Sequence, residues 1–383
     1  MSSQPLIIIG GAVRTGGSLL CRLLDGNDTL HVYPFEIYIH KYYRYHPWYP
    51  LLPDKKNLCN NFNILKKIWI DHWVRISSSG KISKEGLDHV VLNFKKENFL
   101  INCKQKLMQS ENVISIRDIY DILNKSFFEN IGCNNPCQYF VAHRTELYSE
   151  AKNFFNIYPD GYFIHTLRDL KGFCYSIKKW AEKNGYFNID NIYIVKAWLV
   201  ALEIAIFNKL RYNDRYIIIP HTLLIKNSSE VMQDLLNKMS IYYQEINSYP
   251  SFANHLWKGN MTRKDINVEG KVNKSHLFDW KDKLNKKEIQ FLNEIEAPFE
   301  DIFQCNDLDL LNKIIATSFK KWIDLEFQDI QYVFGNMIKK KHLSSKKILK
   351  ARYLYHCVYG PRIRRRKSIF VQNIKNSLLE KFL

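Results

Sequence analysis

The segment that most constrains the fold is an apolar run followed by a glycine-rich loop near the N-terminus. Residues 7–20 read IIIGGAVRTGGSLL. The isoleucines are typical of a buried strand, and the apolar spacing of a helix begins near Ser18. A strand, a glycine loop and a helix in this order bring the backbone N–H groups of a helix N-terminus around an anion. The sequence therefore predicts a phosphate cradle in this loop.

The spacing from Gly11 to Ser18 matches the P-loop pattern G-x-x-x-x-G-K-[ST] at all but one position. Gly17 stands where the lysine belongs, and the nearest cation, Arg14, lies inside the loop. The lysine of a P-loop normally reaches the terminal phosphates of a nucleotide. The loop can therefore hold a phosphate, but its residues disfavour an ordinary ATPase.

Further strand-like segments alternate with helical ones along the chain, which predicts an α/β fold with a central, mainly parallel sheet flanked by helices. The strands are expected at 31–33, 139–142, 162–167 and 216–219. In such sheets ligands bind beyond the carboxyl ends of the strands. We expect an α/β domain over 1–310 with a helical insertion at about 38–135, and a helical, basic extension over 311–383.

The net charge of +18 and the pI of about 9.3 favour anionic partners. The basic residues of 339–383 are read either as a solvated extension or as a weak contact with an anionic membrane or another polyanion. No signature of a nucleic-acid-binding fold is present, so no specific nucleic acid is expected. The short polar start and the lack of an apolar run of about 18 residues predict a cytoplasmic protein, peripheral at a membrane if the tail binds lipid.

The cysteines predict no metal site. Cys133 and Cys137 form C-x₃-C, but no second pair or histidine cluster completes a zinc pattern. Cys21 and Cys174 fall in apolar-periodic stretches and are expected to be packed thiols.

A second informative stretch, residues 163–176, reads FIHTLRDLKGFCYS. Arg168 leaves the end of a strand, and Ser176 follows eight residues later. If a helix begins near Asp169, the guanidinium of Arg168 and the hydroxyl of Ser176 can grip one phosphate. Taken alone, an Arg-Asp pair at a strand end is more often a surface ion pair. His165 is expected to be a packed or orienting histidine.

Together the two stretches resemble the sulfotransferases that use 3′-phosphoadenosine 5′-phosphosulfate (PAPS). Their first motif is roughly G-x-x-[RK]-[ST]-G-[TS]-[TS]-L-L, here GAVRTGGSLL at 11–20, and their second is an apolar residue, R-[DN] and a serine, here 167–176. Residues 139–145 resemble the family strand that ends in a basic-Thr pair, and 257–262 with 270–280 resemble a late loop before a Trp-capped helix. The resemblance covers about residues 5–300.

Three positions depart from the family pattern. Gly17 replaces a Thr or Ser and so removes one hydroxyl from the cradle. Leu170 replaces the proline that commonly follows Arg-Asp. Trp180 stands where some relatives carry an arginine.

The resemblance implies in-line transfer of a sulfuryl group from PAPS to a hydroxyl or amine acceptor, without a metal. Arg14 would act in catalysis, and Arg168 with Ser176 would select the 3′-phosphate of the donor. The residues expected to bind the donor are Arg14, Thr15, Gly16, Gly17, Ser18, Leu19, Arg168, Ser176 and Lys271.

A general base must accept the proton of the acceptor. Glu36 is the first choice, since the resembling enzymes often place an acidic residue after a Pro there; alternatively it caps a helix or pairs with Arg14. His31 and His40 are fallback bases. The aromatic segment 38–49 is read either as core or as a platform for an acceptor, a small molecule or a glycan such as a carbohydrate.

Two other functions stay open. One is a P-loop-like nucleotide kinase or NTPase, which would need a lysine at position 17 and an acidic magnesium ligand at a strand end. The other is a non-catalytic polyanion-binding protein, which the positive charge favours.

Overall fold

The computed structural model describes residues 4–36, 94–110, 115–145, 147–185, 189, 191–252, 255–257, 272–305, 307–311 and 314–315. Several of the expected features, including Lys271, His40, the aromatic segment 38–49 and the basic segment 339–383, lie outside these residues. The division of the chain near residue 310 stays a prediction.

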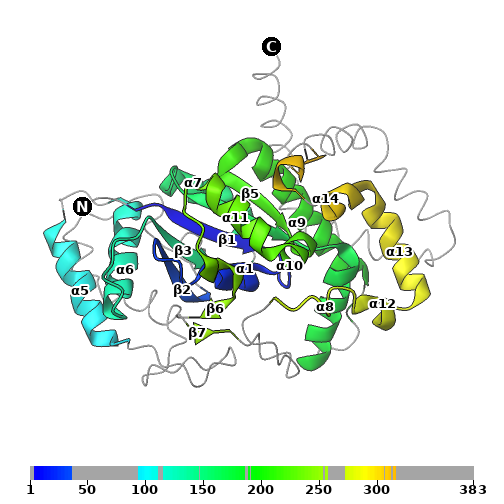
Figure 1. Cartoon of the computed structure of the whole chain (residues 1–383), viewed down its shortest axis with the longest axis horizontal. Coiled ribbons are helices and arrows are strands. Elements are labelled where there is room, and N and C mark those ends of the chain that lie inside the picture. Colours follow the sequence, from blue (N-terminus) through cyan, green and yellow to red (C-terminus); the bar gives the residue numbers. More distant parts are fainter. Residues whose placement is uncertain are drawn as a thin grey trace, which may run out of the picture. The chain divides into compact units, whose positions relative to one another are not determined.

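The core of the fold is a five-stranded sheet in the order β2-β3-β1-β4-β5, in which all neighbouring strands run parallel (Figure 1). The strands are β1 (Leu6–Gly11), β2 (Leu30–Glu36), β3 (Tyr139–His143), β4 (Tyr162–Leu167) and β5 (Tyr216–Pro220). Every residue of β1 is buried, as expected for a strand covered on both faces of a parallel sheet. The predicted fold class is confirmed.

Helices and short turns connect the strands and cover the sheet. The helices are α1 (Gly17–Leu24), α5 (Lys96–Gln109), α6 (Ile116–Asn130), α7 (Ala151–Ile157), α8 (Leu170–Lys183), α9 (Asn191–Tyr212), α10 (His221–Lys226), α11 (Ser228–Lys238), α12 (Trp280–Lys283), α13 (Lys286–Glu296) and α14 (Glu300–Gln304). The 3₁₀ turns are η1 (Leu147–Glu150), η2 (Asn213–Arg215), η3 (Glu245–Ser248) and η4 (Ala297–Phe299), and β6 (Ser251–Phe252) pairs with β7 (His255–Leu256) in a small antiparallel ribbon.

Strand β2 continues past the residues expected from the sequence. The sequence predicted a strand over 31–33, but the strand runs on to Glu36. Pro34 is tolerated because it lies in an edge strand, between the paired residues Val32 and Glu36. The extension brings Glu36 level with His143, the last residue of β3, although the register shifts between Val32 and Glu36.

Helix α9 is the one helix in the described part of the chain that is long and apolar enough to cross a membrane by length and composition. It contacts β4, β5 and α8. Its buried residues include Trp198, whose indole N–H donates to the carbonyl oxygen of Arg168 at 2.7 Å. These contacts are those of a core helix, and they tie α9 to the end of β4.

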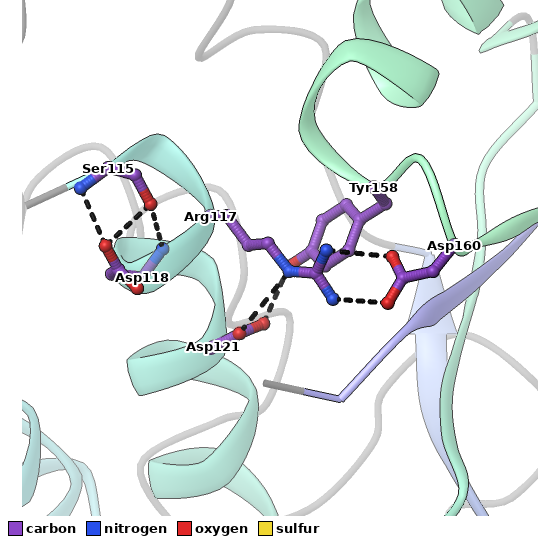
Figure 2. A network of polar contacts seen from close by, with 6 residues as sticks. All are labelled: Ser115, Arg117, Asp118, Asp121, Tyr158 and Asp160. Atoms are coloured by element: carbon purple, nitrogen blue, oxygen red, sulfur yellow. Dashed lines mark hydrogen bonds and ion pairs between the residues drawn. The ribbon is translucent and has the colours of Figure 1, made fainter. Parts of the chain in front are cut away.

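Helix α6 is fixed to the turn before β4 by a polar network (Figure 2). The guanidinium of Arg117 donates two hydrogen bonds to Asp160, at 2.8 and 2.7 Å, and lies over the ring of Tyr158. The hydroxyl of Tyr158 donates to Asp121 at 3.1 Å, and Ser115 with Asp118 forms a capping box. Further along the helix, the rings of Phe127 and Phe128 pack against Tyr33 of β2. The helix therefore bridges β2 and the start of β4.

Candidate active site

The glycine loop joins β1 to α1 and leaves the N-terminus of α1 without a capping side chain. Gly16 occupies the N-cap position with a φ of 100°, and the N–H of Leu20 donates to its carbonyl oxygen. The N–H groups of Gly17, Ser18 and Leu19 precede this ladder, as the first N–H groups of every helix do. They carry the positive end of the helix dipole, which suits an anion.

Arg14 has an unusual backbone. Its φ is 68°, a left-handed conformation that costs a side-chain-bearing residue about 1–2 kcal/mol. The contacts that hold it include two hydrogen bonds: Nη1 of Arg168 donates to its carbonyl oxygen at 3.2 Å, and its own Nε donates to the hydroxyl of Ser176 at 3.1 Å. Strain maintained by neighbouring residues is typical of binding sites.

The two stretches singled out from the sequence therefore meet at one edge of the sheet. Arg168 follows β4 and is buried, so it is not part of a surface ion pair. Asp169 instead accepts a hydrogen bond from the N–H of Gly172 and caps α8. The placement of Ser176 near Arg168, inferred from a helix starting near Asp169, agrees with these contacts. That these residues bind the phosphates of a nucleotide stays a prediction.

Thr15 plays a different part from the one expected. Its side chain is buried, and its hydroxyl donates to the carbonyl oxygen of Ala12 at 2.7 Å and lies 2.9 Å from the hydroxyl of Thr166. The hydroxyl is thus engaged in shaping the loop, and only the backbone N–H of Thr15 is left to meet an anion. Gly11, with a φ of 142°, has no room for a side chain beside Thr166.

Glu36 lies at the end of β2, on the same edge. Its Oε2 accepts a hydrogen bond from Nη1 of Arg144 at 2.7 Å, and its Oε1 lies 3.9 Å from Nδ1 of His143. The ion-pair partner of Glu36 is therefore Arg144 rather than Arg14. The N–H of Arg144 donates to the carbonyl oxygen of Ile9, which ties this group to β1.

His31 is excluded as a base by its place in the fold. It pairs with Phe140, which is level with Leu6, five residues before Gly11. At about 3.3 Å per residue this is roughly 16 Å from the loop. Its ring packs against Phe128, and burial lowers its pKa.

His165 is packed in the core, as expected. Its Nδ1 lies 2.6 Å from the hydroxyl of Tyr216, and burial lowers its pKa to about 3. Cys21 and Cys174 are likewise buried free thiols. Within the described residues, no group of three metal-ligating side chains occurs.

The sequence pointed to Arg144 only as the basic residue of the basic-Thr pair, and it gave no role to two other residues of this edge, His143 and His221. His143 and Arg144 lie at the end of β3, and His221 follows β5, with its Cδ2 2.6 Å from the place of a Cβ on Gly16. The rule that ligands bind at the carboxyl ends of parallel strands could have found both histidines once the strand ends were known.

The departure from the family pattern at Leu170 is explained by Glu296. The N–H of Leu170, which a proline would lack, donates to Oε1 of Glu296 at 2.6 Å, and Lys171 pairs with the same carboxylate. Glu296 is buried, and this desolvation raises its pKa. The buried carboxylate therefore keeps this hydrogen bond only if residue 170 has a backbone N–H, which proline lacks.

We expect Leu170→Pro to lower the free energy of unfolding by about 1–3 kcal/mol, although proline is favourable at the first position of a helix, because it leaves a buried carboxylate oxygen without its donor. In a Glu296→Leu background the same proline should cost less, because no carboxylate remains to be satisfied. Urea denaturation of the four proteins measures both costs. Equal costs in the two backgrounds would contradict this account.

No family model and no curated protein matches the chain. Among solved structures it is similar to the sulfotransferase domain of the Synechococcus PCC 7002 olefin synthase, with 14% identity over 76% of this chain and 95% of that one and a TM-score of 0.45. It is also similar to the sulfotransferase domain from the curacin biosynthetic pathway, with 14% identity over 78% of this chain and 99% of that one and a TM-score of 0.44. A third similar structure is the sulfotransferase STF9 from Mycobacterium avium, with 11% identity over 79% of this chain and 78% of that one and a TM-score of 0.38.

Proposed function

We propose that this chain is a sulfotransferase that moves a sulfuryl group from PAPS to a hydroxyl or amine acceptor. The observation that supports the proposal is that two groups of residues able to bind an anion lie together at one edge of the sheet. The loop before α1 is linked by Arg14 to Arg168 and Ser176. PAPS carries phosphate at both the 5′ and the 3′ position, so it needs two such groups within one nucleotide's reach.

Sulfuryl transfer requires positioning of the reactants and stabilisation of charge more than it requires a reactive cofactor. Negative charge grows on the departing 5′-phosphate, where Arg14 and the N–H groups of α1 would stabilise it. Glu36, across the edge from the loop, would accept the proton of the acceptor. The role of Lys271 as a further cation stays a proposal, as does a carbohydrate acceptor.

Binding of nucleotides separates this function from its alternatives. We expect 3′,5′-adenosine bisphosphate (PAP), the donor's product, to raise the melting temperature, because both anion-binding groups engage it and binding to the folded state stabilises it. ATP with Mg²⁺ and a DNA oligonucleotide should raise it far less. Thermal-shift titration of the full chain measures this.

A shift with ATP and Mg²⁺ alone would overturn the proposal in favour of a kinase or NTPase. A shift with the oligonucleotide alone would favour a polyanion-binding protein. After a positive result, transfer of labelled sulfate from PAPS to a panel of sugars and other hydroxyl compounds would identify the acceptor class.

A further inference from the structure

The side-chain space of the first residue of α1 is filled by a histidine from a neighbouring strand. A Cβ placed on Gly17 would lie 2.6 Å from Nε2 of His143 and 3.0 Å from its Cδ2. Carbon atoms in proteins do not approach this closely, so neither a lysine nor a serine or threonine fits at position 17 while the imidazole stays. The glycine at 17 and the histidine at 143 are therefore coupled.

The imidazole of His143 lies between Glu36 and the N-terminus of α1. His143 ends β3, pairs with Ile9 of β1 and is about nine-tenths buried. Its Nδ1 faces Oε1 of Glu36 at 3.9 Å, and Glu36 is held in turn by Arg144. At 3.9 Å this contact is no hydrogen bond, so the ring can carry its proton on Nε2, the nitrogen that lies beside Gly17 at the N-terminus of α1.

We propose that His143 is a binding residue of the anion cradle and donates from Nε2 to the 5′-phosphate of the nucleotide. It thereby supplies the side-chain contact that Gly17 cannot make, and Gly17 is what admits it. This inference rests on the proposed function, since it names a further residue of the same donor site. Arg144 pairs with Glu36 and so offsets the carboxylate charge beside the ring, and the positive end of α1 favours an anion held between Nε2 and the helix.

A matched pair of substitutions tests the donor role. His143→Gln keeps an N–H near the position of Nε2, whereas His143→Met has the same length and none. Calorimetric titration of the full chain with PAP should show affinity within about threefold of wild type for glutamine and about 10–100-fold weaker for methionine, as for loss of a hydrogen bond to a charged group. His31→Met, the same change at the far end of the sheet, is the control and should leave the affinity unchanged.

The coupling to position 17 gives a second test. Gly17→Ser alone should weaken PAP binding at least about tenfold, since its Cβ must displace the ring, and His143→Ala alone should weaken it through loss of the donor. The double variant Gly17→Ser with His143→Ala should bind PAP more tightly than either single variant, because the serine then has room and supplies a hydroxyl. Additive losses would overturn the proposal, as would equal affinities of the glutamine and methionine variants. Melting temperatures show which variants fold. If Gly17→Ser does not fold, the comparison of His143→Gln with His143→Met alone decides the proposal.

Titration with 5′-AMP distinguishes this inference from the proposed function. 5′-AMP keeps the 5′-phosphate and lacks the 3′-phosphate, so His143→Met should weaken 5′-AMP and PAP by the same factor. A wild-type chain that binds PAP no better than 5′-AMP would contradict the proposed donor while the effect of His143→Met still reports on the cradle. A wild-type chain that binds neither nucleotide removes both proposals.

Discussion

Arg168→Met is expected to abolish most of the preference of this protein for PAP over 5′-AMP. The guanidinium of Arg168 is buried at the end of β4, and methionine fills a similar volume without charge or donors. Truncating a buried, hydrogen-bonded charge that meets a phosphate costs about 2–5 kcal/mol, which corresponds to roughly 30- to 5000-fold in affinity. The measurement is the ratio of the two dissociation constants by calorimetric titration.

The ratio, rather than the affinity for PAP alone, is the decisive quantity. Arg168 also donates to the carbonyl oxygen of Arg14, so its loss disturbs the loop and weakens both nucleotides. That shared effect cancels in the ratio, and only the contact with the 3′-phosphate remains. Ser176→Ala should lower the same ratio by a smaller factor of about 5–20. A ratio that stays at its wild-type value in Arg168→Met would show that the 3′-phosphate binds elsewhere.

Glu36→Gln should lower the rate of sulfuryl transfer by about 10²–10⁴-fold, the usual contribution of a general base. The amide keeps the shape of the side chain and an oxygen for Arg144, so the affinity for PAP should change by less than about threefold. Initial rates with labelled PAPS, together with calorimetric titration of PAP, measure the two effects separately. Near-normal turnover would remove Glu36 from the mechanism.

The ion pair with Arg144 makes a control necessary. If Glu36 serves only to hold Arg144, then Arg144→Gln lowers the rate as much as Glu36→Gln, and the double variant is no slower than either single one. If Glu36 is the base, Arg144→Gln is clearly faster than Glu36→Gln. The comparison therefore separates a proton acceptor from an anchor for the arginine.

The sheet and the glycine loop could be predicted from the sequence because their signals are local. The isoleucines of β1 indicate a buried strand, and Gly16 and Gly17 indicate a backbone that other groups approach closely. The meeting of Arg168 with the loop also followed from a rule of topology, since parallel strands end at one edge. These features needed no knowledge of side-chain packing.

The side-chain contacts between residues of different strands could not be predicted from such local signals. Glu36 meets Arg144 and His143 because β2 runs through Pro34 with a shift of register, and neither the extra strand length nor the shift is encoded in a spacing. The packing of His143 against Gly17 and the contact of Glu296 with Leu170 join residues more than 120 positions apart. Such contacts depend on how layers of the fold pack, which a periodicity does not specify.

The contact between Leu170 and Glu296 also limits the routes by which this sequence can change. A proline at 170 and a carboxylate at 296 are each acceptable alone, but together they leave a buried oxygen without its donor. The two positions are therefore epistatic. Leu170→Pro lowers the stability of the fold while Glu296 is present, so a library that varies only position 170 loses proline, whereas a library that varies both positions retains it. Grafting the family's Arg-Asp-Pro sequence onto this chain requires an apolar residue at 296 to be introduced first.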